Sequence, residues 1–302
     1  MDPVSDLSFF VLLARVGNLS AAAQQLGVTP PTVSKRLAAL ERRLGVRLLH
    51  RTTRRVSLSA EGEAYLAEGS RLLGELQVLE ETVAGSRATP RGLLRVHGTL
   101  GFGRRLLAPA LSAFGREHAE VELQLHLSDR PVNLVEQGFD LAVQLGNLPD
   151  ARLTARRLAR NRRLLCASPR YLRAAGEPAR PAELAAHQCI VLRESDDTFG
   201  TSHLRSGHRQ ETVKVRGRFA SNDGEVALHW ALDGHGILLR SEWDAAPYLR
   251  SGRLAPVLPD WRPADADVFA VYPTKQNLSA RTRALVDFLA AWFEKNPPPR
   301  YD

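Results

Sequence analysis

The chain has 302 residues, of which 44% are hydrophobic and 25% are charged, and its 41 Lys and Arg exceed its 33 Asp and Glu. This length predicts two or three folded units, and the positive net charge suggests a polyanionic partner. No apolar run approaches the roughly 18 to 20 residues of a membrane span, and the first ten residues lack the basic start of a signal peptide. We therefore expect a cytoplasmic protein with no membrane partner.

The basic residues are concentrated at the N-terminus. Residues 1–58 contain nine Lys or Arg and three Asp or Glu, whereas residues 59–88 contain two and six. The rest of the chain has a much smaller basic excess per residue. A basic module followed by an acidic segment is the pattern expected when phosphate groups are bound at one end of the chain.

Three short helices are predicted in the basic module. Apolar residues at three- and four-residue steps over 7–14 mark the first helix, which a Gly-Asn pair ends. Ser20 is expected to cap a second helix over 21–26, and Thr29 to cap a third over 30–44 that has proline at its first position. Two helices joined by a tight glycine-containing turn are the sequence form of a helix-turn-helix.

The third helix is predicted to have a basic outer face. Its apolar stripe, from Val33 to Leu44, must pack on the first two helices. The opposite face carries cations and short hydroxyls, which can bond bases or phosphates in a major groove of DNA. An ordinary solvated helix face is the alternative, but the caps, the turn and the charge together favour DNA.

A short hairpin is predicted after the third helix. Residues 48–49 and 56–58 are expected to form two strands around an arginine-rich turn at 51–55. Such a wing lies against the phosphate backbone or enters a minor groove. The predicted DNA-contacting residues are Ser20, Thr29, Pro30, Pro31, Thr32, Ser34, Lys35, Arg36, Arg51, Arg54 and Arg55.

The acidic segment is predicted to form one helix that begins after Ser59, with two glutamates in its first turn. Apolar residues then follow at spacings of seven, four, three and four, as in the a and d positions of a coiled coil. The same spacing also fits a helix that packs on its own domain. The residues concerned are Tyr65, Leu72, Leu76, Leu79 and Val83.

From residue 89 onward, strands and helices alternate, which predicts a mainly parallel α/β sheet. The expected strands are 93–97, 121–127, 140–145, 164–167, 189–192, 237–239 and 268–273, with a hairpin that turns at 206–207. The expected helices are 104–118, 132–137, 224–232, which Asn222 could cap, and 279–293. Because the last strand is expected to return to the first part of the sheet, we predict two lobes with a cleft between them.

Ligands of open α/β sheets bind beyond the carboxyl ends of the strands, beside helix N-termini that favour anions. Residues 99–103, 146–147 and 221–222 occupy such places in the predicted sheets. We therefore expect a small effector, with a carboxylate as the favoured feature. For any single position, ordinary turn chemistry is an equally good explanation.

Residues 19–66, LSAAAQQLGVTPPTVSKRLAALERRLGVRLLHRTTRRVSLSAEGEAYL, resemble the N-terminal domain of LysR-type transcriptional regulators. The segments FDLAVQLG and SNDGEVALHWALDGHGI resemble the effector domain of that family, and SDRPVNLVEQGFDLAVQLG and LRSGRLAPVLPDW look closest to its CrgA-like subgroup. The resemblance implies an all-α winged helix-turn-helix, a long linker helix that pairs with a second subunit, and an α/β two-lobed effector domain similar to periplasmic binding proteins.

The resemblance also implies domains and sites. It divides the chain into a DNA-binding domain over 1–58, a dimerisation helix over 59–88 and an effector-binding domain over 89–302. Lobe I of that domain covers about 91–161 plus 265–302, and lobe II about 162–264. The implied effector-binding residues are Thr99, Leu100, Gly101, Asn147, Asp196, Asp197, Thr198, Ser221 and Asn222. Double-stranded promoter DNA, a second copy of the chain in a dimer or tetramer, and RNA polymerase are the implied partners.

Two positions depart from the pattern of the family. Pro30 stands where many members have a glutamine that reads bases, so base recognition should depend more on Thr32, Ser34, Lys35 and the wing. Gln144 stands where many members have arginine, which weakens any transfer of an anion-binding role to that strand.

Enzymatic and metal-binding roles are not predicted. The nine histidines form neither HExxH nor a Cys/His metal spacing, and no G-x-S-x-G occurs. A periplasmic solute-binding protein would share the two lobes but would need an export signal and no helix-turn-helix. Cys166 and Cys189 lie in apolar stretches outside any CxxC, so we expect buried thiols, with a redox-sensing pair as the alternative. No cofactor is expected apart from a small-molecule co-inducer.

Overall fold

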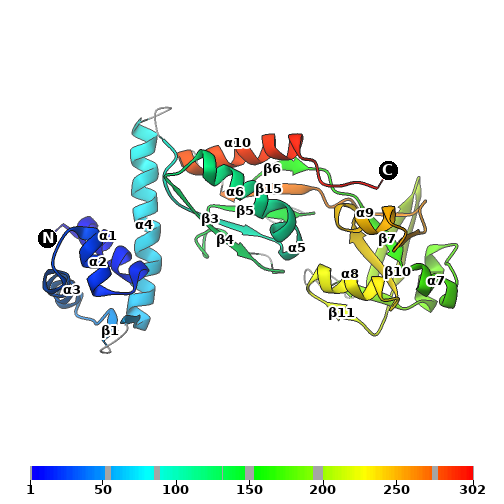
Figure 1. The fold of residues 1–302 in the computed structure, drawn as a ribbon, viewed down its shortest axis with the longest axis horizontal. Coiled ribbons are helices and arrows are strands. Elements are labelled where there is room, and N and C mark those ends of the chain that lie inside the picture. Colours follow the sequence, from blue (N-terminus) through cyan, green and yellow to red (C-terminus); the bar gives the residue numbers. More distant parts are fainter. Residues whose placement is uncertain are drawn as a thin grey trace. The chain divides into compact units, whose positions relative to one another are not determined.

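The structure is a computed structural model, which describes residues 2–51, 56–84, 89–130, 132–146, 153–192, 200–273 and 278–301. The chain folds into two compact units, Met1–Ala88 and Thr89–Asp302 (Figure 1). No helix of the described residues is long and apolar enough to cross a membrane.

The N-terminal unit begins with three helices, α1 (Pro3–Val16), α2 (Leu19–Leu26) and α3 (Pro30–Leu44), as the sequence predicts. The cap of α2 differs from the prediction. Asn18 takes this place, because its Oδ1 accepts the N–H groups of Ser20 and Ala21 at 2.8 and 3.3 Å. Ser20 is therefore the second residue of α2.

The hairpin and the long helix complete this unit. Strands β1 (Leu49–Arg51) and β2 (Val56–Leu58) pair antiparallel, so the first strand begins one residue later than predicted. Helix α4 (Ala60–Ala84) begins at the predicted cap, where the N–H of Gly62 donates to Ser59 Oγ at 2.9 Å. The hydroxyl of Ser59 donates in turn to the carbonyl of Arg47 at 2.6 Å, which fixes the start of α4 to the hairpin.

Lobe I of the C-terminal unit is built on one five-stranded sheet. In spatial order its strands are β4 (Val121–Leu127), β3 (Gly92–Gly98), β5 (Leu141–Leu145), β15 (Val268–Pro273) and β6 (Leu153–Ala159). A continuous helical segment consists of α5 (Leu100–Phe102), a π-helical turn (Gly103–Leu107) and α6 (Ala108–Glu117). Helix α10 (Ala280–Lys295) packs beside α6, and together they cover the core on one face of the sheet (Figure 1).

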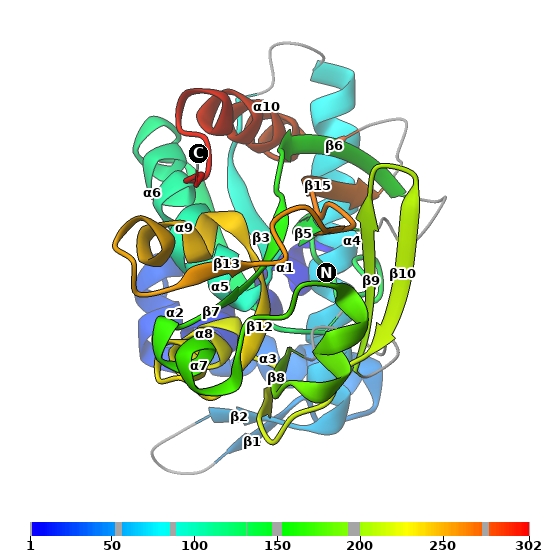
Figure 2. The same ribbon diagram turned by 90° about the vertical axis from the view of Figure 1, so that its right-hand side faces the viewer.

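Lobe II contains a second five-stranded sheet and a smaller one. The order of the larger sheet is β11 (Ala220–Ser221), β8 (Cys189–Leu192), β12 (Ile237–Ser241), β7 (Arg163–Ala167) and β13 (Ala255–Val257). The smaller sheet consists of β10 (Arg209–Lys214), β9 (Thr201–Ser206) and β14 (Arg262–Pro263), and Figure 2 shows its β9–β10 hairpin. The helices are α7 (Pro169–Ala175), a 3-10 helix (Pro181–Ala186), α8 (Gly224–Leu232) and α9 (Glu242–Arg250).

The chain passes twice between the lobes, after β6 and before β15. The two passages are joined to each other, because the N–H of Ala266 donates to the carbonyl of Asn161 at 3.0 Å. The side-chain amide of Asn161 also donates to the carbonyl of Ala266 and to Ser241 Oγ. As predicted, the strand at 268–273 returns to lobe I, where it pairs with β5 and β6.

Each large sheet is mainly parallel, as predicted, with one antiparallel strand, β15 in lobe I and β7 in lobe II. Two predicted details of this unit are wrong. Residues 132–137 form no helix, and the described chain makes only hydrogen-bonded turns there, between 134 and 138. Asp223 rather than Asn222 caps α8, because its carboxylate accepts the N–H of Glu225 at 2.7 Å.

Candidate DNA-binding and effector-binding sites

The outer face of α3 is exposed as predicted. Val33, Leu37 and Leu40 are buried in the core of the unit, whereas Pro31 and Lys35 lie on the exposed side. Thr32 is exposed as well, and Ser34 is half-buried. The hydroxyl of Thr29 makes no cap bond to the backbone but lies 2.9 Å from that of Thr32, so α3 begins at Pro30 with two hydroxyls held together.

Arg36, which is also predicted to contact DNA, reaches from α3 to α1. Its Nη2 donates to Ser5 Oγ at 2.6 Å, and its Nε lies 3.4 Å from the carboxylate of Asp6, which is 1% exposed. Its guanidinium also lies 4.6 Å from the centre of the Phe9 ring. Because a buried carboxylate needs a partner, Arg36 serves to join α3 to α1.

The hairpin is fixed to the same helix. Glu41 of α3 accepts the N–H groups of Leu48 and Leu49 at 2.9 and 3.3 Å. Helix α3 and the base of the hairpin therefore form one rigid piece. Arg54, Arg55 and the side chain of Arg51 lie outside the described residues.

Helix α4 carries an exposed apolar stripe. Leu72, Leu76, Leu79 and Val83 are large apolar side chains on the surface, and Val83 is 83% exposed. Tyr65 does not continue this stripe, because it packs edge-on against Phe10 in the core of its own unit, with 5.4 Å between ring centres. The unpartnered face therefore begins at Leu72.

The predicted effector residues of the two lobes meet at helix starts. Thr99 precedes α5 in lobe I, with Leu100 and Gly101 half-buried behind it. Ser221 ends β11 in lobe II, and the side chain of Asn222 crosses to lobe I, where it donates to Asp129 Oδ2 at 2.7 Å. Helices α5 and α8 are in contact. Asn147, Asp196, Asp197 and Thr198 lie outside the described residues.

A buried arginine of β12 lies between these two helix starts. A Cβ atom added to Gly224, the first residue of α8, would lie 2.0 Å from Nη1 of Arg240. A Cβ added to Gly101 would lie 3.3 Å from its Nη2. Both positions are glycine, which leaves room for the guanidinium between lobes I and II. Arg240 was not among the predicted site residues, although an arginine near the end of an apolar strand, ILLRS, is an unusual pattern that could have revealed it.

The charge of Arg240, which is 5% exposed, is balanced by Asp244 of α9. The carboxylate of Asp244 accepts from Arg240 Nε at 2.5 Å and forms a second ion pair with Arg105 of lobe I. Next to it, Trp243 of α9 reaches into the core of lobe I, where it packs edge-on against Phe102. One cluster therefore spans the boundary between the lobes.

A more exposed ion pair lies beside this cluster. Arg104 Nη2 of lobe I lies 3.1 Å from Asp223 and 2.7 Å from Glu225, both at the start of α8. Partial burial disfavours the charged form of Asp223, but the N–H of Glu225 and the guanidinium of Arg104 outweigh it. The pKa of Asp223 is therefore below its ordinary value.

Known proteins match both units. Residues 4–63 match the bacterial regulatory helix-turn-helix proteins of the lysR family, and residues 87–294 match the LysR substrate binding domain. The chain belongs to the LysR family. The HTH-type transcriptional regulator DmlR of Escherichia coli K12 is 41% identical over 98% of the chain and 96% of the relative. The transcriptional activator TtdR of the same strain is 39% identical over 96% of the chain and 93% of TtdR.

Solved structures agree with this assignment. CrgA, a LysR-type regulator from Neisseria meningitidis, is 32% identical with a TM-score of 0.59, over 95% of this chain and 97% of CrgA. The full-length virulence activator AphB of Vibrio cholerae has a TM-score of 0.60 at 25% identity, over 96% and 99%. The predicted family, its two-lobed α/β regulatory domain and the resemblance to CrgA are confirmed. The chain is a DNA-binding transcriptional regulator, and its relatives are regulators rather than enzymes.

The two cysteines of this LysR-type regulator lie on opposite faces of one sheet. Cys166 pairs with Leu238 and Cys189 with Ile237, on the two sides of β12. Neighbouring positions of a strand point to opposite faces, so the thiols enter separate core clusters. Burial raises the pKa of each thiol to about 12. Strand β12 lies between them, so the two thiols cannot form a disulfide in this arrangement of the sheet.

Proposed function

We propose that the regulator occupies a promoter site of dyad symmetry as a dimer or tetramer, with α3 of two subunits in successive major grooves. The exposed and rigidly held face of α3 is the observation that supports this proposal. Thr32, Ser34 and Lys35 would contact base edges, because Pro30 has no side-chain donor. Arg51, Arg54 and Arg55 of the wing would bind phosphates, with Ser20, Thr29 and Pro31 beside them.

Subunits are proposed to pair through α4. The exposed leucines at 72, 76 and 79, together with Val83, repeat at coiled-coil spacing, and burial of such a stripe against a second copy removes it from water. The pairing fixes the distance between two α3 helices, which a dyad site requires. We expect this regulator to act in the cytoplasm, where promoter DNA and RNA polymerase are its partners.

The effector is proposed to bind between the lobes as a small, carboxylate-bearing molecule. The starts of α5 and α8 meet there, and the guanidinium of Arg240 lies beside both of them. Helix N-termini and a guanidinium all favour negative charge. An effector that binds one lobe arrangement better than another would shift the placement of the DNA-binding domains, by no more than the difference in its affinity for the two arrangements.

Two substitutions test the proposed DNA face and effector site separately. Lys35→Ala should weaken binding to operator DNA in an anisotropy titration, while leaving the thermal unfolding midpoint unchanged because Lys35 is exposed. Thr99→Val should leave that affinity unchanged but blunt the response of transcription to the effector. Unaltered DNA affinity in Lys35→Ala would show that α3 is not the reading helix. Equal loss of both functions in Thr99→Val would indicate a folding defect.

A further inference from the structure

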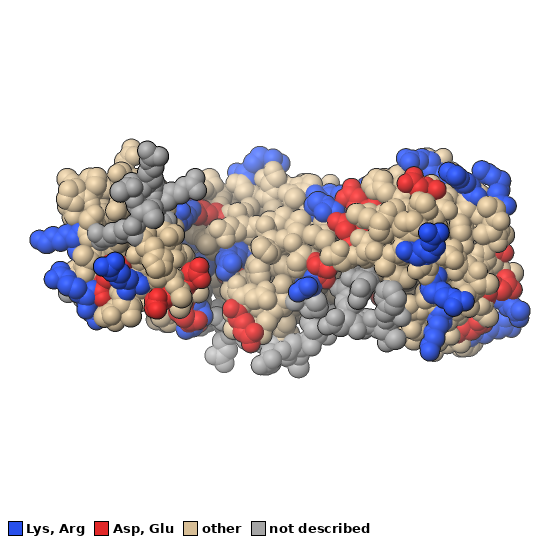
Figure 3. Space-filling view, turned by 90° about the horizontal axis from the view of Figure 1, so that it is seen from below, with Lys and Arg blue, Asp and Glu red and all other residues tan. Residues whose placement is uncertain are grey.

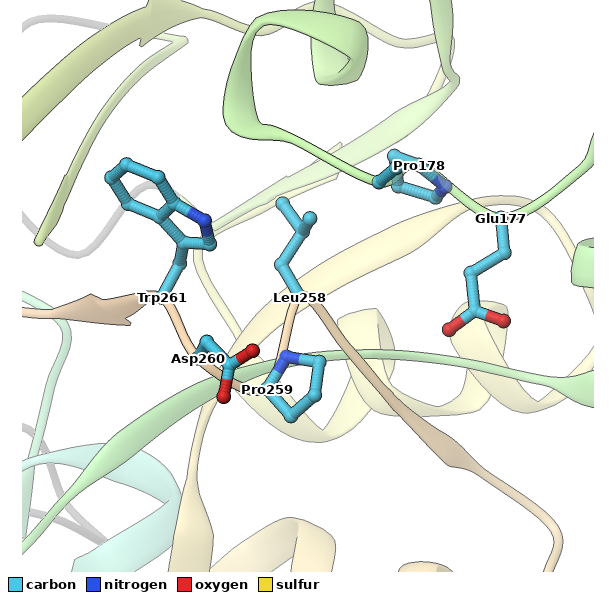
Figure 4. Close-up of a pocket in the computed structure, with 7 residues that line it drawn as sticks. Glu177, Pro178, Leu258, Pro259, Asp260 and Trp261 are labelled. Carbon is cyan, nitrogen blue, oxygen red and sulfur yellow. The ribbon is translucent and has the colours of Figure 1, made fainter. Parts of the chain in front are cut away.

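A pocket opens in lobe II, and none of its residues belongs to the boundary contacts between the lobes. It has a volume of about 390 Å³. Residues 177–179, after α7, form one wall, and residues 258–261, between β13 and β14, form the other (Figure 4). Trp261 and Pro259 supply apolar surface in front of the buried Leu258 and Pro178. Glu177 and Asp260 supply exposed carboxylates.

The wall at 258–261 is held in an unfavourable backbone conformation. Leu258 has a φ of 50°, and among the described residues no other non-glycine residue has a positive φ. Such a conformation costs about 1–2 kcal/mol, so the surrounding packing must stabilise it. The side chain of Leu258 is buried in the core of lobe II, and its carbonyl accepts the N–H of Trp261 at 2.9 Å. The turn thereby presents Pro259 and Asp260 at the surface.

The opposite wall is fixed as well. Gly176, with a φ of 81°, ends α7, and Pro178 behind it is buried. The N–H of Ala179 donates to Glu183 Oε2 at 2.9 Å. Because both walls are fixed by the chain's own contacts, the pocket is formed before any ligand arrives.

The charge of the pocket is opposite to that of the protein. Glu177 and Asp260 form no hydrogen bond or ion pair with any described residue, whereas nearby Glu183 and Asp265 are paired with arginines. The whole chain has a net charge of +8, and Lys and Arg are prominent on the face in Figure 3. Two unpaired carboxylates beside an indole and the exposed ring of Pro259 repel anions and attract cations that carry apolar groups.

We propose that this pocket binds a small organic cation, of the quaternary ammonium or guanidinium class, as a second ligand site of the regulator. The indole of Trp261 would contact the cation, and Glu177 and Asp260 would balance its charge. A pocket of this volume lies at the small end of the range for small-molecule sites, roughly 300 to 1,000 Å³. A free molecule is therefore the proposed source of the cation, rather than a basic side chain of another subunit.

The binding experiment uses the full chain with choline and agmatine as probes, followed by calorimetry and ligand-observed NMR at constant ionic strength. At least one probe should bind saturably. The neutral isostere of choline, 3,3-dimethylbutan-1-ol, should bind about fivefold or more weakly, because it lacks the charge. Absence of saturable binding for both probes, or equal binding of choline and its isostere, would overturn the proposal.

Substitutions of the lining residues test whether the probe binds in this pocket. Trp261→Leu should lower the affinity for the probe about fivefold or more. Glu177→Gln and Asp260→Asn, which change exposed side chains, should each lower it about threefold. Glu117→Gln, an exposed carboxylate of lobe I, is the matched control and should have no effect. If Glu177→Gln and Asp260→Asn both bind like the wild type, the site is wrong. Because Trp261→Leu also removes packing, the two carboxylate variants decide the outcome if it fails to fold.

Two further measurements separate this proposal from its alternatives. Operator affinity should be the same in all three variants, so failure of the pocket and failure of the proposed DNA function are distinguishable. Sedimentation of the full chain should not change when choline is added. A choline-dependent loss of oligomers would show that a basic side chain of a second copy fills the pocket, and would overturn the free-molecule source.

Discussion

Two regions of the molecule use the same polar cluster, a buried aspartate between two arginines beside an aromatic ring. In the N-terminal unit, Asp6 binds Arg36 and Arg43, and Arg36 stacks on Phe9. At the boundary between the lobes, Asp244 binds Arg240 and Arg105 beside Trp243.

The two clusters differ in the burial of one arginine, because Arg105 is 39% exposed like Arg43 but Arg240 is buried, and they differ in what they join. The side chains of Arg36 and Arg43 are 32% and 39% exposed, and their contacts lie within one unit. Arg240 is 5% exposed, and its aspartate also pairs with an arginine of the other lobe. The first cluster therefore holds α3 at a fixed position on α1. The free energy of the second depends on how the lobes are placed, because its members belong to both.

The largest effect is expected from Asp244→Asn. The substitution removes the buried carboxylate that pairs with both Arg240 and Arg105, which should lower the free energy of unfolding by about 3–5 kcal/mol. Urea unfolding followed by circular dichroism measures the loss. Asp287→Asn is the control, because its ion pair with Arg156 is exposed and should contribute about 0.5 kcal/mol. Similar losses for the two variants would show that the ion pairs of Asp244 contribute no more to the free energy of unfolding than an exposed pair does.

The next effect is expected from Gly224→Ala. The added methyl group would lie within 2.2 Å of three guanidinium atoms of Arg240, so the arginine must move, at a cost of about 1–3 kcal/mol. Gly74→Ala provides a control of opposite sign, because its Cβ meets open space on α4. Removal of a helical glycine there should stabilise the chain by about 0.5–1 kcal/mol. A stabilised Gly224→Ala variant would contradict the position given to Arg240.

A loss smaller than that of Asp244→Asn, of about 1–3 kcal/mol, is expected from Asp6→Asn, because Arg36 and Arg43 retain contact with water. The same variant should bind operator DNA more weakly, since α3 is no longer fixed to α1 by charge. Thermal unfolding and anisotropy titration measure the two effects. Losses equal to those of Asp244→Asn would remove the difference between the two clusters.

The smallest effect is expected from Arg104→Gln, which removes an exposed pair worth about 0.2–1 kcal/mol. The pKa of Asp223 is lowered in the folded state, so its contribution is complete above the unfolded pKa of about 3.9 and disappears as the pH falls through the folded value. The difference between wild type and variant should therefore be constant from about pH 5 to 8 and shrink below about pH 4. Unfolding free energies measured at pH 7 and pH 3.5 test this. A difference that grows in acid would contradict the assignment.

Local signals explain what the sequence predicted. Helices α1, α3 and α4 were predicted from capping residues and from the spacing of apolar residues. Both signals come from residues that are close together in the sequence. The cap of α2 was misplaced because Asn18 and Ser20 are both good caps, and only the path of the backbone decides between them. Strand β6 was missed because its residues, LTARRLA, alternate poorly and carry two arginines.

The boundary cluster could not be predicted in the same way. Asp244 and Arg105 are 139 residues apart, and no local pattern joins them. Arg36 was predicted on the DNA face from its angle on α3, and its contact with the buried carboxylate of Asp6 could not be predicted from that angle. Sequence periodicity gives the direction of a side chain, but the partner of a buried charge comes from the fold.

The two buried thiols have a practical consequence. Maleimides react with thiolates, and a pKa of about 12 leaves Cys166 and Cys189 almost wholly protonated as well as enclosed. The native protein should therefore resist labelling while folded. A single cysteine introduced at an exposed position, such as Glu117 of lobe I or Arg209 of lobe II, would be the one reactive thiol of the chain. Fluorescent dyes attached in this way could follow the lobes during effector binding without removal of either native cysteine.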